Sequence, residues 1–139
     1  MTIGAAWGAG EHIAGTPFRL VVPGSETSGH AIVLTVDMPP GLHVDAHTHE
    51  TEDQINIVLS GQVRFRIGDE ETVLGAGGVL LMPRHTEHEL WNDTGEFARL
   101  IEIYTPPGME QRFAAAGAAA VADGKSFANA DDYATSRAT

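Results

Sequence analysis

The chain has 139 residues, of which 42% are hydrophobic and 19% charged, and this length and composition indicate a single globular domain. Its net charge of -11 argues against nucleic acids and anionic membranes as partners, and no apolar run approaches the ~20 residues that span a bilayer. The lack of cysteine excludes disulfides and thiolate metal ligands. No signal peptide is recognisable, so we expect a cytoplasmic protein.

The N-terminal part of the chain predicts an arm followed by short strands. Residues 1–16 mix glycine, alanine and polar residues without a period, which indicates an irregular arm. Apolar, β-branched segments follow at 18–22 and 31–38, and glycine or proline ends each of them. After a Pro-Pro-Gly break comes a histidine-rich stretch, which leads into the apolar segment 55–59.

The middle of the chain has the clearest strand pattern. Segment 62–67 alternates, with Val63 and Phe65 on one face and Arg64 and Arg66 on the other, as in a half-buried antiparallel strand. Gly68-Asp69 predicts a hairpin turn. Further strands are predicted at 71–74, 79–82, 88–92 and 97–104. Eight or more short strands without a helical period indicate an antiparallel sandwich or barrel.

The C-terminal part differs in composition. Segment 109–121 is rich in alanine and has high helix propensity despite Gly117, with Phe113 as its main apolar anchor. Residues after Gly124 are polar and predict a second short helix or a flexible end. We therefore expect an arm at 1–16, an all-β barrel at 17–106 and a helical tail at 107–139.

Three histidines and an amide form a candidate metal site. His47 and His49 are two residues apart, so both side chains leave the same face of an extended strand. Gln54 offers an amide oxygen just before the next strand, and His88 adds a third imidazole further along the chain. Imidazoles and an oxygen donor on one side of a sheet can bind a divalent metal ion.

The oxygen ligand has alternatives. Glu52 is two residues from Gln54 and would share its face of a strand, but it lies nearer the turn. Asp53 points to the opposite face if the strand has already begun there. Gln54 itself is alternatively a core amide that hydrogen-bonds the backbone. We expect His43 and His85 at the rim of the site or behind its ligands, and not on the ion.

Two motifs resemble those of the cupin superfamily, over about residues 31–106. The first, G-x5-H-x-H-x3,4-E-x6-G, has Gln54 at its glutamate position, and the second, G-x5-P-x-G-x2-H-x3-N, has His85 at its last glycine position. The matching residues are Gly41, His47, His49, Gly61, Gly77, Pro83, His88 and Asn92. The resemblance implies a double-stranded β-helix, a small jelly-roll barrel, which the composition extends by a short C-terminal helical tail. It also implies one divalent transition metal ion per chain, held by His47, His49, Gln54 and His88.

With glutamine at the glutamate position of the first motif, the chain resembles small cupins that linearise unsaturated uronates, and also cupin hydroxynitrile lyases. Segment 101–106, Ile-Glu-Ile-Tyr-Thr-Pro, resembles the uronate group as well, which implies catalytic roles for Glu102 and Tyr104. The arginine expected directly after this segment in that group is absent here.

We also expect Glu89 and Trp91 on the face opposite His88, with Trp91 packed against an arm or a second subunit.

The ligand set predicts the chemistry. Neutral imidazoles and a neutral amide leave the full charge on the ion, which favours a Lewis-acid role and an anionic, oxygen-rich ligand. Mn, Fe, Co, Ni and Zn all fit this donor set. We expect a metal-dependent lyase or isomerase acting on a small hydroxy- or keto-acid. The alternatives are a dioxygenase of the quercetinase or diketone-cleaving kind and a non-catalytic binding protein. Strand edges that need covering predict a homodimer.

Overall fold

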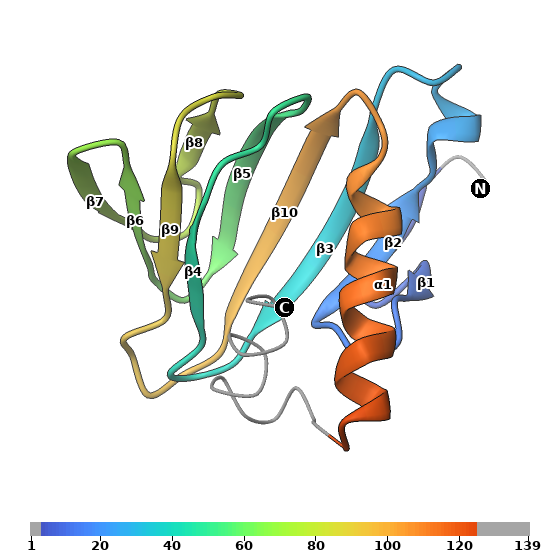
Figure 1. Cartoon of the computed structure of the whole chain (residues 1–139). Coiled ribbons are helices and arrows are strands. Elements are labelled where there is room, and N and C mark those ends of the chain that lie inside the picture. The colour runs from blue at the N-terminus through green and yellow to red at the C-terminus, as the bar shows by residue number, and fades with distance from the viewer. Residues whose placement is uncertain (1–3, 125–139) are drawn as a thin grey trace.

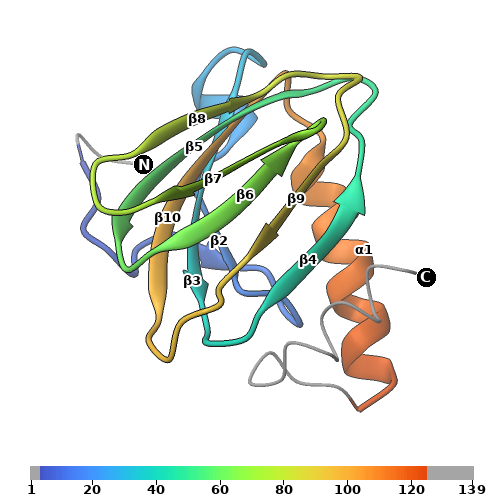
Figure 2. The ribbon, with the colours of Figure 1, turned by 90° about the vertical axis from the view of Figure 1, so that its left-hand side faces the viewer.

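The computed structural model describes residues 4–124, which form two antiparallel sheets and one α-helix (Figures 1 and 2). The larger sheet has the order β1-β2-β3-β10-β5-β8 and the smaller one β4-β9-β6-β7. The larger sheet contains β1 (Glu11–His12), β2 (Phe18–Val22), β3 (Ile32–Met38), β5 (Asp53–Ser60), β8 (Val79–Met82) and β10 (Ala98–Thr105). The smaller contains β4 (His43–His47), β6 (Val63–Ile67), β7 (Glu70–Leu74) and β9 (His88–Trp91).

The predicted all-β barrel is confirmed. Alternation along the strands places one set of side chains between the two sheets, and in β10 every second residue from Ala98 to Tyr104 is buried. In β6, Val63 and Phe65 are fully buried while Arg64 and Arg66 lie on the outer face, as the alternation predicts. The core therefore lies between the inner faces of the two sheets.

The segment predicted to be an irregular arm contains a short strand. β1 pairs with β2 in the register Glu11↔Leu20 and His12↔Arg19. Gly10 and Gly15 flank this strand with positive φ angles of 93° and 75°, which allow the chain to turn tightly. A strand of two residues is too short to show any period, so the sequence pattern could not reveal it.

The predicted helix is confirmed as α1 (Met109–Ala122). Its buried side faces the core, and α1 packs on the β2 side of the larger sheet (Figure 1). Phe113 stacks on Phe18 with ring centroids 4.0 Å apart. A Cβ at Gly117 would overlap the backbone oxygen of Ala14, so glycine allows the helix to pass close to the N-terminal segment. The tail beyond Gly124 lies outside the described residues.

Short connections complete the described chain. The turn η1 (Gly24–Glu26) joins β2 to β3. Asn92 is fully buried after β9, where its amide donates to the backbone oxygens of Met38 and Glu96 at 3.0 and 2.8 Å. Within residues 4–124, no helix has the length and apolarity needed to cross a bilayer.

Candidate metal centre

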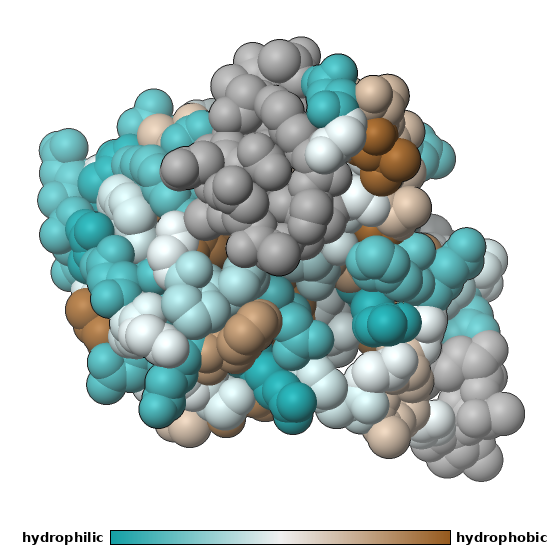
Figure 3. All heavy atoms as spheres, turned by 90° about the horizontal axis from the view of Figure 1, so that it is seen from below, coloured by the Kyte–Doolittle hydropathy of each residue, from teal (hydrophilic) through white to brown (hydrophobic). Residues whose placement is uncertain are grey.

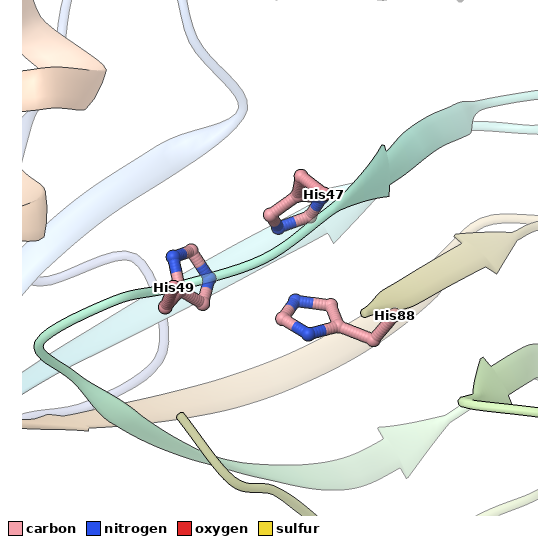
Figure 4. Close-up of side chains that lie close together, drawn as sticks. All are labelled: His47, His49 and His88. Carbon is pink, nitrogen blue, oxygen red and sulfur yellow. The ribbon is translucent and has the colours of Figure 1, made fainter. Parts of the chain in front are cut away.

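Three histidines meet where two strands of the smaller sheet end. His47 is the last residue of β4 and His88 the first of β9, and the antiparallel register places them opposite each other. Figure 4 shows their rings and that of His49 grouped together. The candidate ligand atoms of the three all lie within 4.8 Å of one another. The predicted clustering of these imidazoles is confirmed, at a spacing that suits a single ion.

His49 arrives by a different route from the one predicted. β4 ends at His47, and the register shifts between Val44 and His47, so His49 belongs to the loop and not to the strand. The backbone N–H of His85 donates to the carbonyl oxygen of His49 at 2.8 Å, which holds this loop in place. The two imidazoles therefore converge through a bulge and an anchored loop.

The surroundings of the imidazoles suit metal ligands. His49 and His88 are buried, at 4% and 1% exposure, while His47 is half-buried. Nδ1 of His47 lies 2.7 Å from the carbonyl oxygen of Asp45. A ligating histidine commonly donates its second ring N–H to such an acceptor, which fixes the ring and leaves Nε2 for the ion. The histidine set therefore fits a transition metal ion.

Gln54 lies beside the histidines. Its side chain is 2% exposed, and Oε1 lies 3.1 Å from Nε2 of His49. Two ligands held at ~2.1 Å from one ion at a right angle lie ~3.0 Å apart, so this spacing also suits neighbouring metal ligands. Its Nε2 donates to Oδ1 of Asn56 at 2.8 Å, which orients the amide oxygen toward His49. The amide of Gln54 thus hydrogen-bonds the side chain of Asn56, and not the backbone as the alternative prediction assumed.

The two rival oxygen donors have other partners. Asp53 faces outward and binds Arg84, with Oδ2 at 3.2 Å from Nη2, and these hydrogen bonds lower the pKa of Asp53. Glu52 is buried at 1% exposure and pairs with Arg112 from α1. Burial raises the pKa of Glu52, but hydrogen bonds from Thr51 and Arg112 outweigh it, so the net pKa is lowered. Both carboxylates are therefore held as anions by arginines.

Glu102 and Tyr104 face the interior, as the resemblance implied. They are 4% and 2% exposed, and the Tyr104 hydroxyl donates to Oε1 of Glu102 at 2.7 Å. The Tyr104 ring lies edge-on to that of His49, with centroids 5.7 Å apart. Tyr104 also pairs with Gln54 in the β10–β5 register. The carboxylate, the phenol and the proposed ligands thus occupy one region of the core.

A small cavity borders Glu102, Tyr104 and one of the proposed ligands, His47. It has a volume of about 20 Å³ and is lined by Phe18, Val44, His47, Leu90, Glu102, Tyr104 and Phe113. This is room for about one water molecule or an ion. Phe113 belongs to α1, so the helix forms one wall of the cavity. A larger ligand would have to displace side chains of this wall.

Several residues lie elsewhere than predicted, or were missed. His43 is on the outer face, bonded to Glu89 at 2.5 Å and stacked on Trp91, so its expected place at the site is wrong. Trp91 lies against His43 and, at 3.9 Å, Arg64, which corrects its expected packing against an arm, while its packing against a second subunit stays a prediction. Sequence patterns also missed Arg112 and the position of Phe113 on the cavity, because no local period indicates which distant side chains they contact. Asn56 was missed although it lies only two residues from Gln54, on the same face of β5.

His85 occupies the glycine position of the second motif for a visible reason. Its φ is 68°, in the left-handed region that glycine favours. Its side chain is exposed and pairs with Glu50 at 3.0 Å, outside the group of imidazoles. The backbone of His85 nevertheless supports the site, because its N–H anchors the loop of His49.

Comparisons with known proteins agree with this architecture. A structure of KdgF from Halomonas sp. has a TM-score of 0.62 and 22% identity, covering 70% of this chain and 84% of that chain. A predicted oxalate decarboxylase from Thermotoga maritima has a TM-score of 0.61 and 20% identity, covering 65% and 79%. The cupin domain of Cnp3 from Schizosaccharomyces pombe has a TM-score of 0.63 and 15% identity, covering 79% and 78%. At these identities the likeness concerns the fold.

The sequence also matches a protein family directly. No curated protein matches it significantly. The family described as "Cupin domain", in contrast, matches residues 34–104, which is just over half of the chain and includes both histidine motifs and all but the last residue of β10. This protein therefore belongs to the cupin family.

Proposed function

We propose that this cupin binds one divalent transition metal ion through His47, His49, Gln54 and His88, and is a lyase or isomerase acting on a small hydroxy- or keto-acid. The observation that carries this proposal is the shared cavity, which brings the carboxylate of Glu102 to the same small space as His47. The bound ion would act as a Lewis acid on an oxygen of the substrate.

The residues of the chain have separate tasks in this proposal. Glu102 exchanges a proton with the substrate as general acid or base, and the hydrogen bond from Tyr104 holds its carboxylate in position. Phe18 and Phe113 keep water away from the reacting groups. The resemblance of segment 101–106 to uronate-linearising cupins supports a sugar-acid-like substrate.

A dioxygenase is the second candidate. The apolar walls of the cavity favour it, since Phe18, Val44, Leu90 and Phe113 would contact an aromatic or diketone substrate once side chains of the wall are displaced to admit it. A redox-active metal and uptake of O2 would distinguish this activity from lyase or isomerase chemistry. A non-catalytic protein would bind such molecules without turnover.

Metal analysis and turnover test the proposal together. We expect up to one transition ion per chain in protein purified without chelator. His47→Ala or His88→Ala should abolish it, while the exposed His30 serves as a matched control in His30→Ala. Glu102→Gln should retain the metal and lose turnover of sugar acids. Full metal content in both ligand variants would refute the site, and O2 uptake with flavonols or diketones would favour the second candidate.

A further inference from the structure

A groove separates α1 from the hairpin formed by β1 and β2. It lies on the inner side of the larger sheet, since Glu11 and Leu20 are opposite each other in the β1–β2 register and Leu20 packs against the core. Figure 1 shows α1 in front of these two strands. The groove has a volume of about 440 Å³, within the range of small-molecule sites. No residue that lines it within 4–124 also lines the cavity at the metal centre, so the two spaces are separate.

Small side chains on α1 create this groove. Glu110, Ala114 and Ala118 follow one another at intervals of four residues, so they form one stripe along the helix. From the first to the last of them the helix rises by ~12 Å, which makes the stripe long and narrow. The two alanine methyl groups leave open the space that longer side chains would fill. The facing wall is aliphatic and consists of Ile13, Ala14 and Leu20.

Contacts next to the groove hold its two walls at a fixed separation. Phe113 of α1 stacks on Phe18 of β2, with ring centroids 4.0 Å apart. Further along the helix, the backbone at Gly117 approaches Ala14 so closely that a Cβ on this glycine would overlap the carbonyl oxygen of Ala14. The helix is thus fixed against the N-terminal segment at two levels. The groove is therefore preformed, as most small-molecule sites are.

The charged groups of the groove are acidic. Glu11 lines it from β1 and Glu110 from α1, whereas none of the arginines within residues 4–124 does. His12 also lines the groove, and its Nε2 lies 2.8 Å from the carbonyl oxygen of Thr16. Oε1 of Glu110 is buried and has no hydrogen-bond partner among the described residues. The helix dipole favours a glutamate in the first turn of α1, but it does not explain the burial of an unpaired oxygen, which is costly. A donor brought by a ligand would satisfy this oxygen.

We propose that this groove binds a small alkylammonium compound. The ammonium group donates to Oε1 of Glu110, and the alkyl chain lies along Ala114 and Ala118. An ammonium has donors only, so it matches an unpaired carboxylate oxygen, and a hydrogen bond between charged groups is stronger than one between neutral groups. An aliphatic chain suits the walls because no phenylalanine, tyrosine or tryptophan of the described chain lines them.

The charge and the surface of the protein favour this ligand over others. The net charge of -11 attracts cations, and the two carboxylates that line the groove repel anions. The face seen in Figure 3 is mainly hydrophilic where its atoms are coloured by hydropathy, and its hydrophobic patches are small and separate. An alkyl chain therefore has little competing surface on that face. The site is independent of the metal and of the proposed activity.

Isothermal titration calorimetry of the full chain with hexylamine tests the proposal, with hexanol and hexanoate as its neutral and anionic counterparts. We expect saturable binding of a single hexylamine, and binding of the counterparts that is at least about tenfold weaker. Glu110→Gln keeps the shape of the side chain and should lower the affinity for hexylamine by about tenfold or more. Glu70→Gln is the matched control, because Glu70 is exposed on β7 of the other sheet, and it should bind as the wild type does.

A second pair of variants locates the alkyl chain. Ala114→Leu fills the groove and should abolish binding, whereas Ala115→Leu, at an exposed position of α1 outside the groove, should not. Protein treated with a chelator should also retain binding, which excludes coordination of the amine to a metal ion at the histidines. Equal melting temperatures show that the variants are folded.

Several results would overturn the proposal. These are no saturable binding at millimolar hexylamine, equal binding of hexanol or hexanoate, wild-type affinity in Glu110→Gln or Ala114→Leu, and loss of binding in Glu70→Gln, in Ala115→Leu or after chelation. Tighter binding of a lysine blocked at both ends would assign the groove to a side chain of another protein and would also overturn it.

Discussion

Replacing Gln54 by glutamate tests the proposed metal centre at a single atom. The substitution keeps an oxygen at the position 3.1 Å from Nε2 of His49 and exchanges the amide nitrogen, which donates to Asn56, for a second oxygen. That oxygen would face Oδ1 of Asn56, and both are acceptors. Nδ2 of Asn56 is buried without a hydrogen-bond partner in the described residues, so rotation of its amide would present a donor to the new carboxylate. The variant should therefore fold.

The size of the effect follows from the charge. A carboxylate next to a divalent ion gains many kcal/mol of Coulomb energy even at an effective dielectric constant of ~20, but its desolvation offsets most of this gain. We expect a net increase in metal affinity of about ten- to hundredfold, or ~1.4 to ~2.8 kcal/mol. The added negative charge lowers the Lewis acidity of the ion, so turnover of a hydroxy- or keto-acid should fall although the metal is held more tightly.

Competition with a chromophoric chelator measures the affinity, and thermal melting of the metal-free protein measures the fold. Gln54→Leu is the companion variant, which removes the donor and should weaken metal binding. Unchanged affinity in Gln54→Glu together with a lower melting temperature would refute the role of Gln54 as a ligand. Tighter binding with higher turnover would instead favour the dioxygenase.

Three further substitutions test the structure around the site. Arg112→Met should cost about 1–2 kcal/mol of unfolding free energy at pH 7, because it leaves the buried carboxylate of Glu52 without its arginine partner. The cost is moderate because the side chain of Arg112 is itself half exposed, so that solvent weakens the ion pair. The pKa of Glu52 is below its ordinary 4.5, so this contribution is present above that pH and is lost as the pH falls through the folded pKa, which acid titration of both proteins checks. Phe113→Ala should cost ~2–4 kcal/mol and speed extraction of the metal by a chelator, and an unchanged rate would show that α1 does not restrict access. His85→Gly should raise stability by ~0.5–1 kcal/mol in thermal melts by relieving the positive φ, whereas a loss would mean that its pair with Glu50 matters more.

The sequence predicted well what depends on local pattern. Alternating burial places Phe65 inside and Arg66 outside, and the same parity places Asp53 on the outer face of β5. The spacing of the histidines and the match to known motifs predicted that His47 and His88 lie together. These features depend on the strand period of two residues or on a motif, and both can be read without knowledge of the fold.

The remainder depends on which distant strands become neighbours. Glu89 is 46 residues from His43 and Arg112 is 60 residues from Glu52, and no period links such pairs. The bulge in β4 that brings His49 to its neighbours is likewise invisible as a pattern, because it arises where two strands of unequal length are paired. The sequence therefore predicted which face of a strand a side chain occupies better than which distant side chain it contacts.

The position of β10 has a consequence for how the chain acquires its structure. β10 is the last strand within residues 4–124, yet it lies in the middle of the larger sheet between β3 and β5 (Figure 1). During synthesis from the N-terminus, all four proposed ligands emerge from the ribosome before this strand does. Until then, β3 and β5 each have an open edge that another chain can pair with. Closure requires Tyr104 to reach Ile32, so we expect the sheet to form in one late, non-local step and to be most prone to aggregation just before it.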